Sequence, residues 1–472
     1  MSQKGKIEAF DQYVMNNIPI HLIRLSDMSL VGRDDVREHF KGTVPEEGSS
    51  RYRYYPSDHV KYAVLSHRWL RQGEPTYKEM EAGTASGLGY EKLKQFCEKA
   101  KECDVEFAWS DTCCIDKSSS TELDESIRSM FRWYKNSAIC IIHLAQSKTI
   151  QDIMNDEWIT RSWTLQELLA PHKIKFFNED WKPMTGRIND KSYLKTDVIM
   201  QTLEKATGIP HDDLHRFSPG PQKVDTRMTW AANRKTTRVE DVAYSLMGIF
   251  DVSLQIAYGE GGDRAFCRLI EAIMHAGDPS VLNWSGEVAN HPTSSAIPRS
   301  PESFVGHQAV RWDARLEMTM TSLGLRVPVV VFPLNFHSTM DMGNGYFCVT
   351  FSSPLSPTMK LGVNTKSRII QRAHQFALGI LNYSLISDGS CEVLQIAVKS
   401  AGFILSRTTY SLPFPTRLCG VVLGAVSRPK HIFGQWRMGM QAGLVKVNFP
   451  TRKIRTHSKF YMDRKYLETD YL

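Results

Sequence analysis

The residues from Arg161 to Leu168 place an aromatic ring and a carboxylate one helical turn apart in an otherwise apolar stretch. Trp163 and Glu167 stand at i and i+4 and would share one face of a helix. A carboxylate that faces a cleft can stabilise positive charge in a transition state. The opposite face would pack into a core through Leu165, Leu168 and Leu169. Carboxylates are seldom buried without a partner, so the octapeptide alone favours a solvated Glu167.

Alternating strands and helices would position this helix. Helical spacing of apolar residues predicts helices over 90–103 and 123–134, and Pro171 would end the helix that carries Glu167. Short apolar runs predict strands at 62–66, 105–109, 138–144 and 173–177. This alternation predicts an α/β fold over residues 60–185, with a mainly parallel sheet and helices on both faces.

The segments on either side of this core differ from it in their predicted secondary structure. Residues 1–59 predict a lead-in strand within 18–25 and a loop, and residues 186–285 predict a helical extension with helices over 239–249 and 264–274. From 286 to 472 we expect a β-rich C-terminal domain of unknown role. Its predicted strands cover 325–332, 346–351, 393–398 and 421–426. The basic tail from 428 to 465 is either a solvated surface or an anion-binding face.

Composition limits the class of protein and its compartment. The 472 residues are 42% hydrophobic and 10% aromatic, with a net charge of +7. This charge is modest for the length and does not by itself indicate nucleic acid. No apolar run is long enough to span a membrane, and the N-terminus lacks a signal-peptide h-region. Nine cysteines without framework spacing favour reduced thiols. We therefore expect a cytoplasmic protein.

Several motifs occur in a fixed order. They are Tyr62-Ala-Val-Leu-Ser-His-Arg-Trp69, Trp109-Ser-Asp-Thr-Cys-Cys-Ile-Asp116, Glu122-Leu-Asp-Glu-Ser-Ile127, Met130-Phe-Arg-Trp-Tyr134 and Arg161-Ser-Trp-Thr-Leu-Gln-Glu-Leu-Leu-Ala-Pro171. This order resembles the fungal heterokaryon-incompatibility (HET) domain. Residues 227–250 and 258–261 look like the segment that commonly follows it. The resemblance covers roughly residues 20–285 and leaves the C-terminal part unassigned.

The core is also similar, more distantly, to TIR domains. Their flavodoxin-like sheet opens with a strand that ends in a Ser-Phe-Arg-type sequence, and a later helix carries Ser-x-Trp-Cys-Leu-x-Glu-Leu. The counterparts here are residues 66–68 and 161–168, in which Arg161 and Thr164 replace the family's Ser and Cys. The glutamate of TIR enzymes is catalytic in cleaving NAD. The resemblance therefore implies a flavodoxin-like core in which Glu167 is catalytic and Trp163 lies beside it.

NAD suits a site with a single carboxylate. Most glycosidases use a second carboxyl group to protonate the leaving group, whereas the nicotinamide of NAD is a pyridinium that leaves neutral. The candidate substrate-binding residues are Ser66, His67, Arg68, Trp69, Asp111 and Trp163. Arg68 follows the first strand, where open α/β sheets bind ligands, and could take a phosphate. Core packing remains the alternative for both Trp residues, and capping remains the alternative for Asp111.

Other possible sites are weaker. Cys113 and Cys114 with His67 could form a nucleophile and base, but no protease signature surrounds them, so buried inert thiols are the simpler interpretation. No Cys-x-x-Cys pair occurs, and we expect neither a metal nor a cofactor other than NAD or NADP as substrate.

Two segments further along the chain could also bind a phosphate. The basic run 234–238 could do so, although the neighbouring Glu240 and Asp241 favour an internal salt-bridge patch. The glycine-rich residues 258–262 lack the P-loop ending and predict a turn and a helix start.

Two functions of different classes follow. The first is a HET-type effector of non-self recognition and cell death that hydrolyses NAD or NADP, switched on by self-association as the TIR resemblance implies. The second is a non-enzymatic module that docks onto itself or a protein partner, in which Trp163 and Glu167 only maintain the helix.

Overall fold

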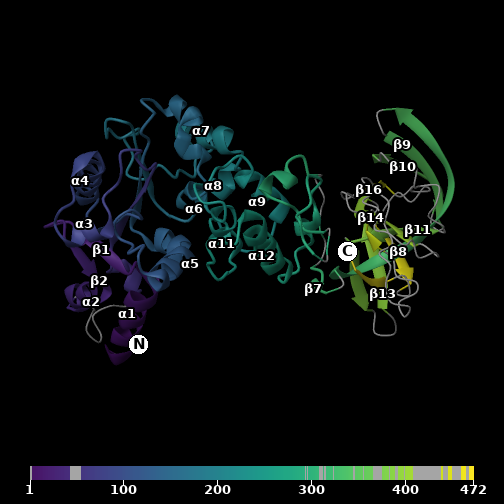
Figure 1. Ribbon diagram of the computed structural model, residues 1–472, viewed down its shortest axis with the longest axis horizontal. Helices are drawn as coiled ribbons and strands as arrows, with labels where there is room; N and C mark the ends of the chain where they lie inside the picture. Colours follow the sequence, from purple (N-terminus) through teal and green to yellow (C-terminus); the bar gives the residue numbers. More distant parts are fainter. Residues whose placement is uncertain are drawn as a thin grey trace. The chain divides into compact units, whose positions relative to one another are not determined.

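The computed structural model describes residues 3–42, 55–292, 294, 296–307, 312 and 315–322 and, from 324 on, the strands named below (Figure 1). The chain divides into two compact units, 1–220 with 233–259, and 221–232 with 260–472. The predicted boundaries at residues 59, 185 and 285 stay predictions. In the described part of the chain, no helix has the length and apolar character needed to cross a bilayer.

A mainly parallel sheet forms the core of the first unit. Its strand order is β2-β1-β4-β3-β5-β6. The parallel strands are β3 (Tyr62–His67), β4 (Phe107–Trp109), β5 (Ile139–His143) and β6 (Ile174–Phe177). Since β4 lies on one side of β3 and β5 on the other, the chain order reverses at β3. The predicted α/β class and all four predicted strands of the core are confirmed.

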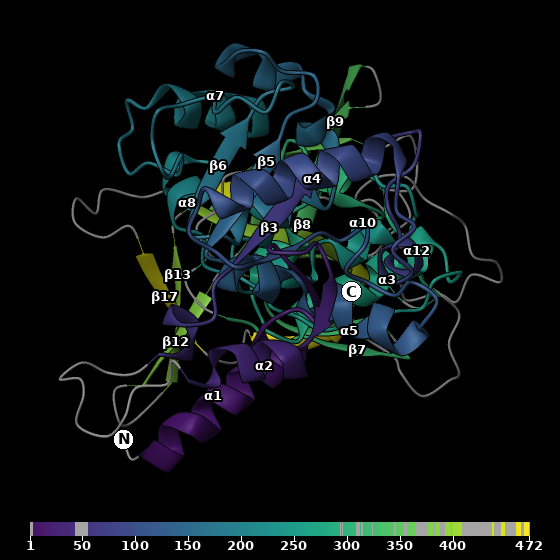
Figure 2. The same cartoon turned by 90° about the vertical axis from the view of Figure 1, so that its left-hand side faces the viewer.

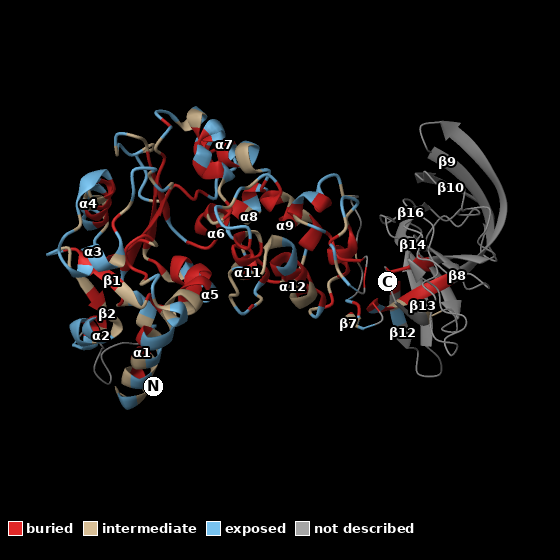
Figure 3. Ribbon diagram, viewed as in Figure 1, coloured by how far each residue is buried: buried red, intermediate tan, exposed pale blue. Residues whose placement is uncertain are grey.

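Helices cover both faces of this sheet. In Figure 1, α4 (Gly87–Lys101) lies on one face, and α5 (Ser120–Asn136) and α6 (Thr164–Leu169) lie on the other; Figure 2 shows α4 in front of the sheet. Two hydrogen bonds tie α5 to β3: Tyr134 Oη donates to the Leu65 carbonyl at 2.8 Å, and Tyr62 Oη donates to the Trp133 carbonyl at 2.7 Å. Figure 3 shows the resulting buried side of α5. Additional helical segments are α3 (Tyr77–Glu81), η1 (Pro56–Asp58), η2 (Ile150–Asn155) and η3 (Glu157–Thr160).

The N-terminal segment corrects the sequence prediction. Strand β1 (His21–Arg24) lies in the predicted lead-in, but it joins the core sheet, antiparallel to both β4 and β2 (Leu30–Gly32). The prediction missed α1 (Gln3–Asn17) and α2 (Arg33–Lys41). Helix α1 buries Phe10 and Val14, and so narrow an apolar stripe is weak evidence for a helix in sequence. Residues 43–54 of the predicted loop lie outside the described residues.

Helices make up about half of residues 186–285, the predicted helical extension, and irregular chain joins them. The first unit contains α7 (Val198–Thr207), α8 (His211–His215), α10 (Asp241–Tyr244) and α11 (Met247–Phe250). The second contains α9 (Val224–Ala231), α12 (Gly262–Met274) and η4 (Pro279–Leu282), and η5 (Pro301–Phe304) follows beyond the end of the predicted extension. The single helix predicted over 239–249 is wrong, because the chain forms two short helices there. Helix α12 starts directly after the glycine-rich turn, as predicted.

The described segments after residue 318 are strands. They are β7 (Thr319–Thr321), β8 (Gly324–Gly343), β9 (Tyr346–Ser353), β10 (Ser356–Asn364), β11 (Gln375–Ile380), β12 (Tyr383–Ser387), β13 (Glu392–Ala397), β14 (Lys399–Arg407), β15 (Arg437–Met438), β16 (Val445–Asn448), β17 (Lys459–Asp463) and β18 (Leu467–Tyr471). Predicted strands 325–332 and 346–351 lie in β8 and β9, and 393–397 lies in β13. Residues 421–426 and most of the basic tail lie outside the described residues, so a β-rich domain from 286 to 472 stays a prediction.

Candidate functional site

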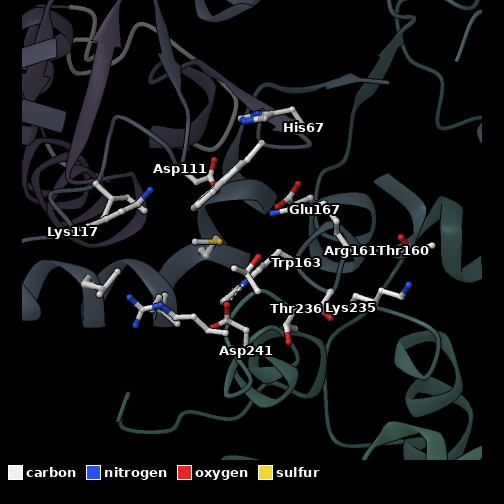
Figure 4. A pocket seen from close by; sticks show the side chains of 18 of the residues that line it. His67, Asp111, Lys117, Thr160, Arg161, Trp163, Glu167, Lys235, Thr236 and Asp241 are labelled. Atoms are coloured by element: carbon white, nitrogen blue, oxygen red, sulfur yellow. Dashed lines mark hydrogen bonds between the residues drawn. The ribbon is translucent and has the colours of Figure 1, made fainter. Parts of the chain in front are cut away.

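A pocket of about 400 Å³ opens at the carboxyl ends of the parallel strands (Figure 4). All its lining residues belong to the first unit. The loop after β3 contributes His67 and Trp69, the loop after β4 contributes Asp111, and α6 with the residues before it contributes Trp163 and Glu167. Side chains of α5 form an apolar wall. Open α/β sheets bind ligands where the strand order reverses, and this pocket occupies that position.

Glu167 is buried yet lines the pocket, with 6% of its surface exposed. Its Oε2 accepts a hydrogen bond of 2.5 Å from Ser66 Oγ, which itself accepts one of 2.8 Å from Trp158 Nε1. Burial, and secondly the negative charge of Asp111, raise the pKa of Glu167 to about 8. The Ser66 hydrogen bond and the nearby arginines 161 and 234 act in the opposite direction. The carboxyl group is therefore mostly protonated at neutral pH.

Local hydrogen bonds fix the short helix that carries Glu167. At its start, Thr164 Oγ1 donates to the Trp158 carbonyl at 2.6 Å. At its end, the buried Lys191 Nζ donates to the carbonyls of Leu169 and Pro171 at 3.0 and 2.7 Å. The helix ends at Leu169, as Pro171 predicted.

Trp163 stands at the start of this helix and shares the pocket with Glu167. Its Nε1 donates to Asp241 Oδ2 at 3.0 Å, and Tyr258 Oη donates to Asp241 Oδ1 at 2.9 Å. The leucines on the opposite face are buried, as predicted: Leu165, Leu168 and Leu169. The predicted two-sided helix is therefore confirmed, but Glu167 is buried rather than solvated.

Three more of the predicted substrate-binding residues line the same pocket. Burial lowers the pKa of His67 well below its usual range. Neither of its ring nitrogens finds a hydrogen-bond partner in the part of the chain that is described, and its Nε2 lies 3.8 Å from Glu74 Oε1. Trp69 is 39% exposed, and its Nε1 donates to Asp111 Oδ2 at 3.0 Å. Trp69 can therefore offer a ring face to a ligand, whereas both ring nitrogens of His67 are buried.

Ser66 and Arg68 do not line this pocket. Ser66 lies behind Glu167, and Arg68 Nε pairs with Glu157 Oε2 at 2.9 Å beside a separate hollow. Side chains along an extended chain alternate between two sides, which separates residues 66 and 68 from His67 and Trp69. The phosphate predicted at Arg68 would therefore bind outside the cavity that holds Glu167.

One wall of the pocket comes from residues 235–238, which sequence reasoning left outside the site. The Lys235 backbone N–H donates to the Thr160 carbonyl at 2.6 Å, and the Ser162 N–H donates to the Lys235 carbonyl at 3.0 Å. Arg234 Nη1 donates to the Arg161 carbonyl at 2.9 Å. These bonds hold the basic residues 234–238 against the start of α6.

Asp241, one of the two acids expected to pair with the basic run, accepts hydrogen bonds from Trp163 and Tyr258. The positive charge of Arg238 acts to lower the pKa of Asp241, against the larger effect of burial.

The remaining candidate groups are inert or incomplete. Cys113 and Cys114 are buried, and burial raises the pKa of Cys114 far above its usual range, so a thiolate nucleophile does not form here. The sequence prediction missed a His-x-x-x-His pair, His211 and His215 on α8, whose ring centroids lie 6.3 Å apart. Within the described ranges, no group of three His, Cys, Asp or Glu side chains is placed to hold a metal ion.

Comparison with known proteins identifies the family that part of this chain matches. Residues 62–152 match the family model described as heterokaryon incompatibility protein (HET). The chain contains a HET domain. A stretch of 225 residues is also 43% identical to the vegetative incompatibility protein HET-E-1 of Podospora anserina, covering 45% of this chain and 16% of that protein. No solved structure matches significantly. The HET match ends before Glu167, so the pocket joins the matched segment to residues that follow it.

Proposed function

We propose that this chain is an effector of fungal non-self recognition and cell death that hydrolyses the N-glycosidic bond of NAD or NADP through Glu167. The observation that carries the proposal is a carboxyl group buried in a pocket of about 400 Å³. Burying such a group is costly, and strongly shifted carboxyl groups gather at functional sites. The HET domain and the relative named for vegetative incompatibility support the broader role.

The strand order favours a TIR-like core. The parallel strands run β4-β3-β5-β6, the order of the corresponding strands in flavodoxin-like sheets, where the ligand lies at the reversal. Glu167 and Trp163 line the pocket at that reversal, as the TIR resemblance implies.

The chemistry needs one carboxylate. The bond between ribose C1′ and the nicotinamide nitrogen breaks, and its electron pair neutralises the pyridinium. Glu167 stabilises the cationic ribose that remains. Water adds to C1′ and loses a proton, which the Glu167 carboxylate can accept. The products are nicotinamide, ADP-ribose or its phosphorylated form, and a proton.

The positive charge of the substrate also favours the ionised form of Glu167. A positive charge near a carboxyl group favours its ionised form. The pyridinium of bound NAD would therefore lower the pKa of Glu167 from about 8. Substrate binding then creates the charge that the transition state requires.

The second candidate function is a non-enzymatic docking module. It is favoured by the internal pairing of predicted ligand-binding groups, since Trp163 bonds to Asp241 and Arg68 bonds to Glu157. On this account Ser66 and Glu167 form a structural buried pair.

Nicotinamide release distinguishes the two functions. Wild type, Glu167→Gln and the control Glu91→Gln, which changes an exposed carboxylate of α4 outside the pocket, are incubated with NAD or NADP over a series of protein concentrations. The proposal predicts release by wild type and the control, rising with self-association, and loss in folded Glu167→Gln. Equal release by wild type and Glu167→Gln, or no release by wild type at any assembling concentration, would contradict it.

A further inference from the structure

Two cations flank Trp69 at the mouth of the pocket. Lys117 Nζ lies 4.4 Å from the centre of the Trp69 ring, and the Arg161 guanidinium lies 5.8 Å from it. Both side chains line the cavity that holds Glu167. Across the described residues, neither is paired with a carboxylate. Lys117 Nζ donates instead to the Thr112 carbonyl at 3.4 Å.

Exposure increases from Glu167 to Lys117. Glu167 is buried, Arg161 is half-buried and Lys117 is exposed. Arg161 lies close enough to Glu167 to lower its pKa. A ligand whose reacting end contacts Glu167 would thus pass Arg161 and then Lys117 on its way out.

We propose that Lys117 and Arg161 form a subsite for the diphosphate of a dinucleotide, with Trp69 as its floor. This rests on the proposed function and names the part of the substrate that the mouth of the pocket recognises. A diphosphate carries two negative charges, which match two cations. Charge-assisted hydrogen bonds to phosphate are stronger than a cation's contact with an exposed ring. Both Lys117 and Arg161 can therefore move from the Trp69 ring to bind phosphate, and the ring face stays in contact with the ligand.

The neighbouring charges support this placement. Asp111, which accepts from the Trp69 indole N–H, would repel a phosphate and is better suited to ribose hydroxyls. Lys235 also lines the cavity, but Figure 4 separates it from Lys117 across the cavity. Arg68 does not line the pocket, and it is paired with Glu157, a carboxylate that does. Among the predicted and observed cations, Lys117 and Arg161 are thus the pair gathered on one ring.

Binding of ADP-ribose tests the subsite without any bond cleavage. Its dissociation constant is measured by calorimetry at low salt for wild type, Lys117→Ala, Lys117→Glu and the control Lys205→Ala, which removes an exposed charge of α7 away from the pocket. We expect weakening of about tenfold for Lys117→Ala, more for Lys117→Glu and less than about twofold for Lys205→Ala, because a charge-assisted hydrogen bond is lost only at the subsite. Inorganic diphosphate should compete with ADP-ribose in wild type.

Turnover provides an independent readout. Lys117→Ala should raise the KM for NAD with little change in kcat, and should leave hydrolysis of nicotinamide riboside, which lacks phosphate, unchanged. Equal ADP-ribose affinity in wild type and Lys117→Glu would overturn the subsite even if Glu167 hydrolyses NAD. ADP-ribose binding that Lys117→Glu abolishes, without NAD hydrolysis by wild type, would keep the subsite and reject the proposed function.

Discussion

The burial of Glu167 predicts a specific dependence of stability on pH. The folded-state pKa is raised from 4.5 to about 8. The folded protein therefore holds a proton that the unfolded chain releases above pH 4.5. The stabilisation from this proton is complete below that pH and is lost as the pH rises through 8. Glu167→Gln has nearly the same shape and cannot ionise, so it removes this dependence.

The size of the effect follows from linkage. Each pH unit between the two pKa values changes the relative free energy of unfolding by about 1.4 kcal/mol. Between pH 5 and pH 8, the advantage of Glu167→Gln over wild type should therefore grow by roughly 3 to 4 kcal/mol. The variant should be the more stable protein at pH 8.

Urea denaturation followed by tryptophan fluorescence at several pH values measures this difference. Leu168→Ala is the matched control, because it removes a buried, uncharged side chain from the same helix. It should cost about 3 kcal/mol at every pH. Parallel curves for wild type and Glu167→Gln from pH 5 to pH 8 would refute the argument, since they would mean that Glu167 ionises normally in the folded protein.

Three further changes have defined outcomes. Ser66→Ala removes the hydrogen bond that favours the ionised Glu167; the pH-dependent loss of stability should continue to higher pH in the same urea series, and an unchanged upper limit would contradict the pairing. Lys92→Met leaves the half-buried Glu74 without its counter-charge; we expect a loss of about 3 kcal/mol in thermal unfolding, whereas a neutral result would show that the pair does not hold the loop after β3. Gly248→Ala places a Cβ 2.2 Å from Phe131 Cβ; destabilisation of about 1 to 3 kcal/mol is expected by calorimetry, and wild-type stability would contradict the close packing of α11 on α5.

Short-range sequence patterns predicted the elements that position the site. Helical spacing identified α4, α5 and α6, and apolar runs identified β3 to β6. The pairing of Trp163 and Glu167 in one pocket followed from their i and i+4 spacing. Alternation along β3 could also have separated Ser66 and Arg68 from the residues that face the ligand.

The burial of Glu167 and the composition of the pocket wall depend on distant parts of the chain. Ser66 is 101 residues from Glu167, and a tertiary hydrogen bond joins Lys235 to Thr160, 75 residues earlier in the chain. No local pattern specifies either contact. The basic run at 234–238 was visible in the sequence, but its orientation toward a cavity or toward nearby acids was not.

The most direct test of the account is the pH dependence of kcat/KM for nicotinamide release from NAD. This ratio reports ionisations of the free enzyme, and here it requires an ionised Glu167. It should rise about tenfold per pH unit below pH 8 and level off above it, because the pKa of the unliganded carboxyl group is about 8. Glu167→Gln should show no such rise. A wild-type rate that is constant from pH 6 to pH 9, or a Glu167→Gln profile that follows it, would contradict a catalytic role for this carboxylate.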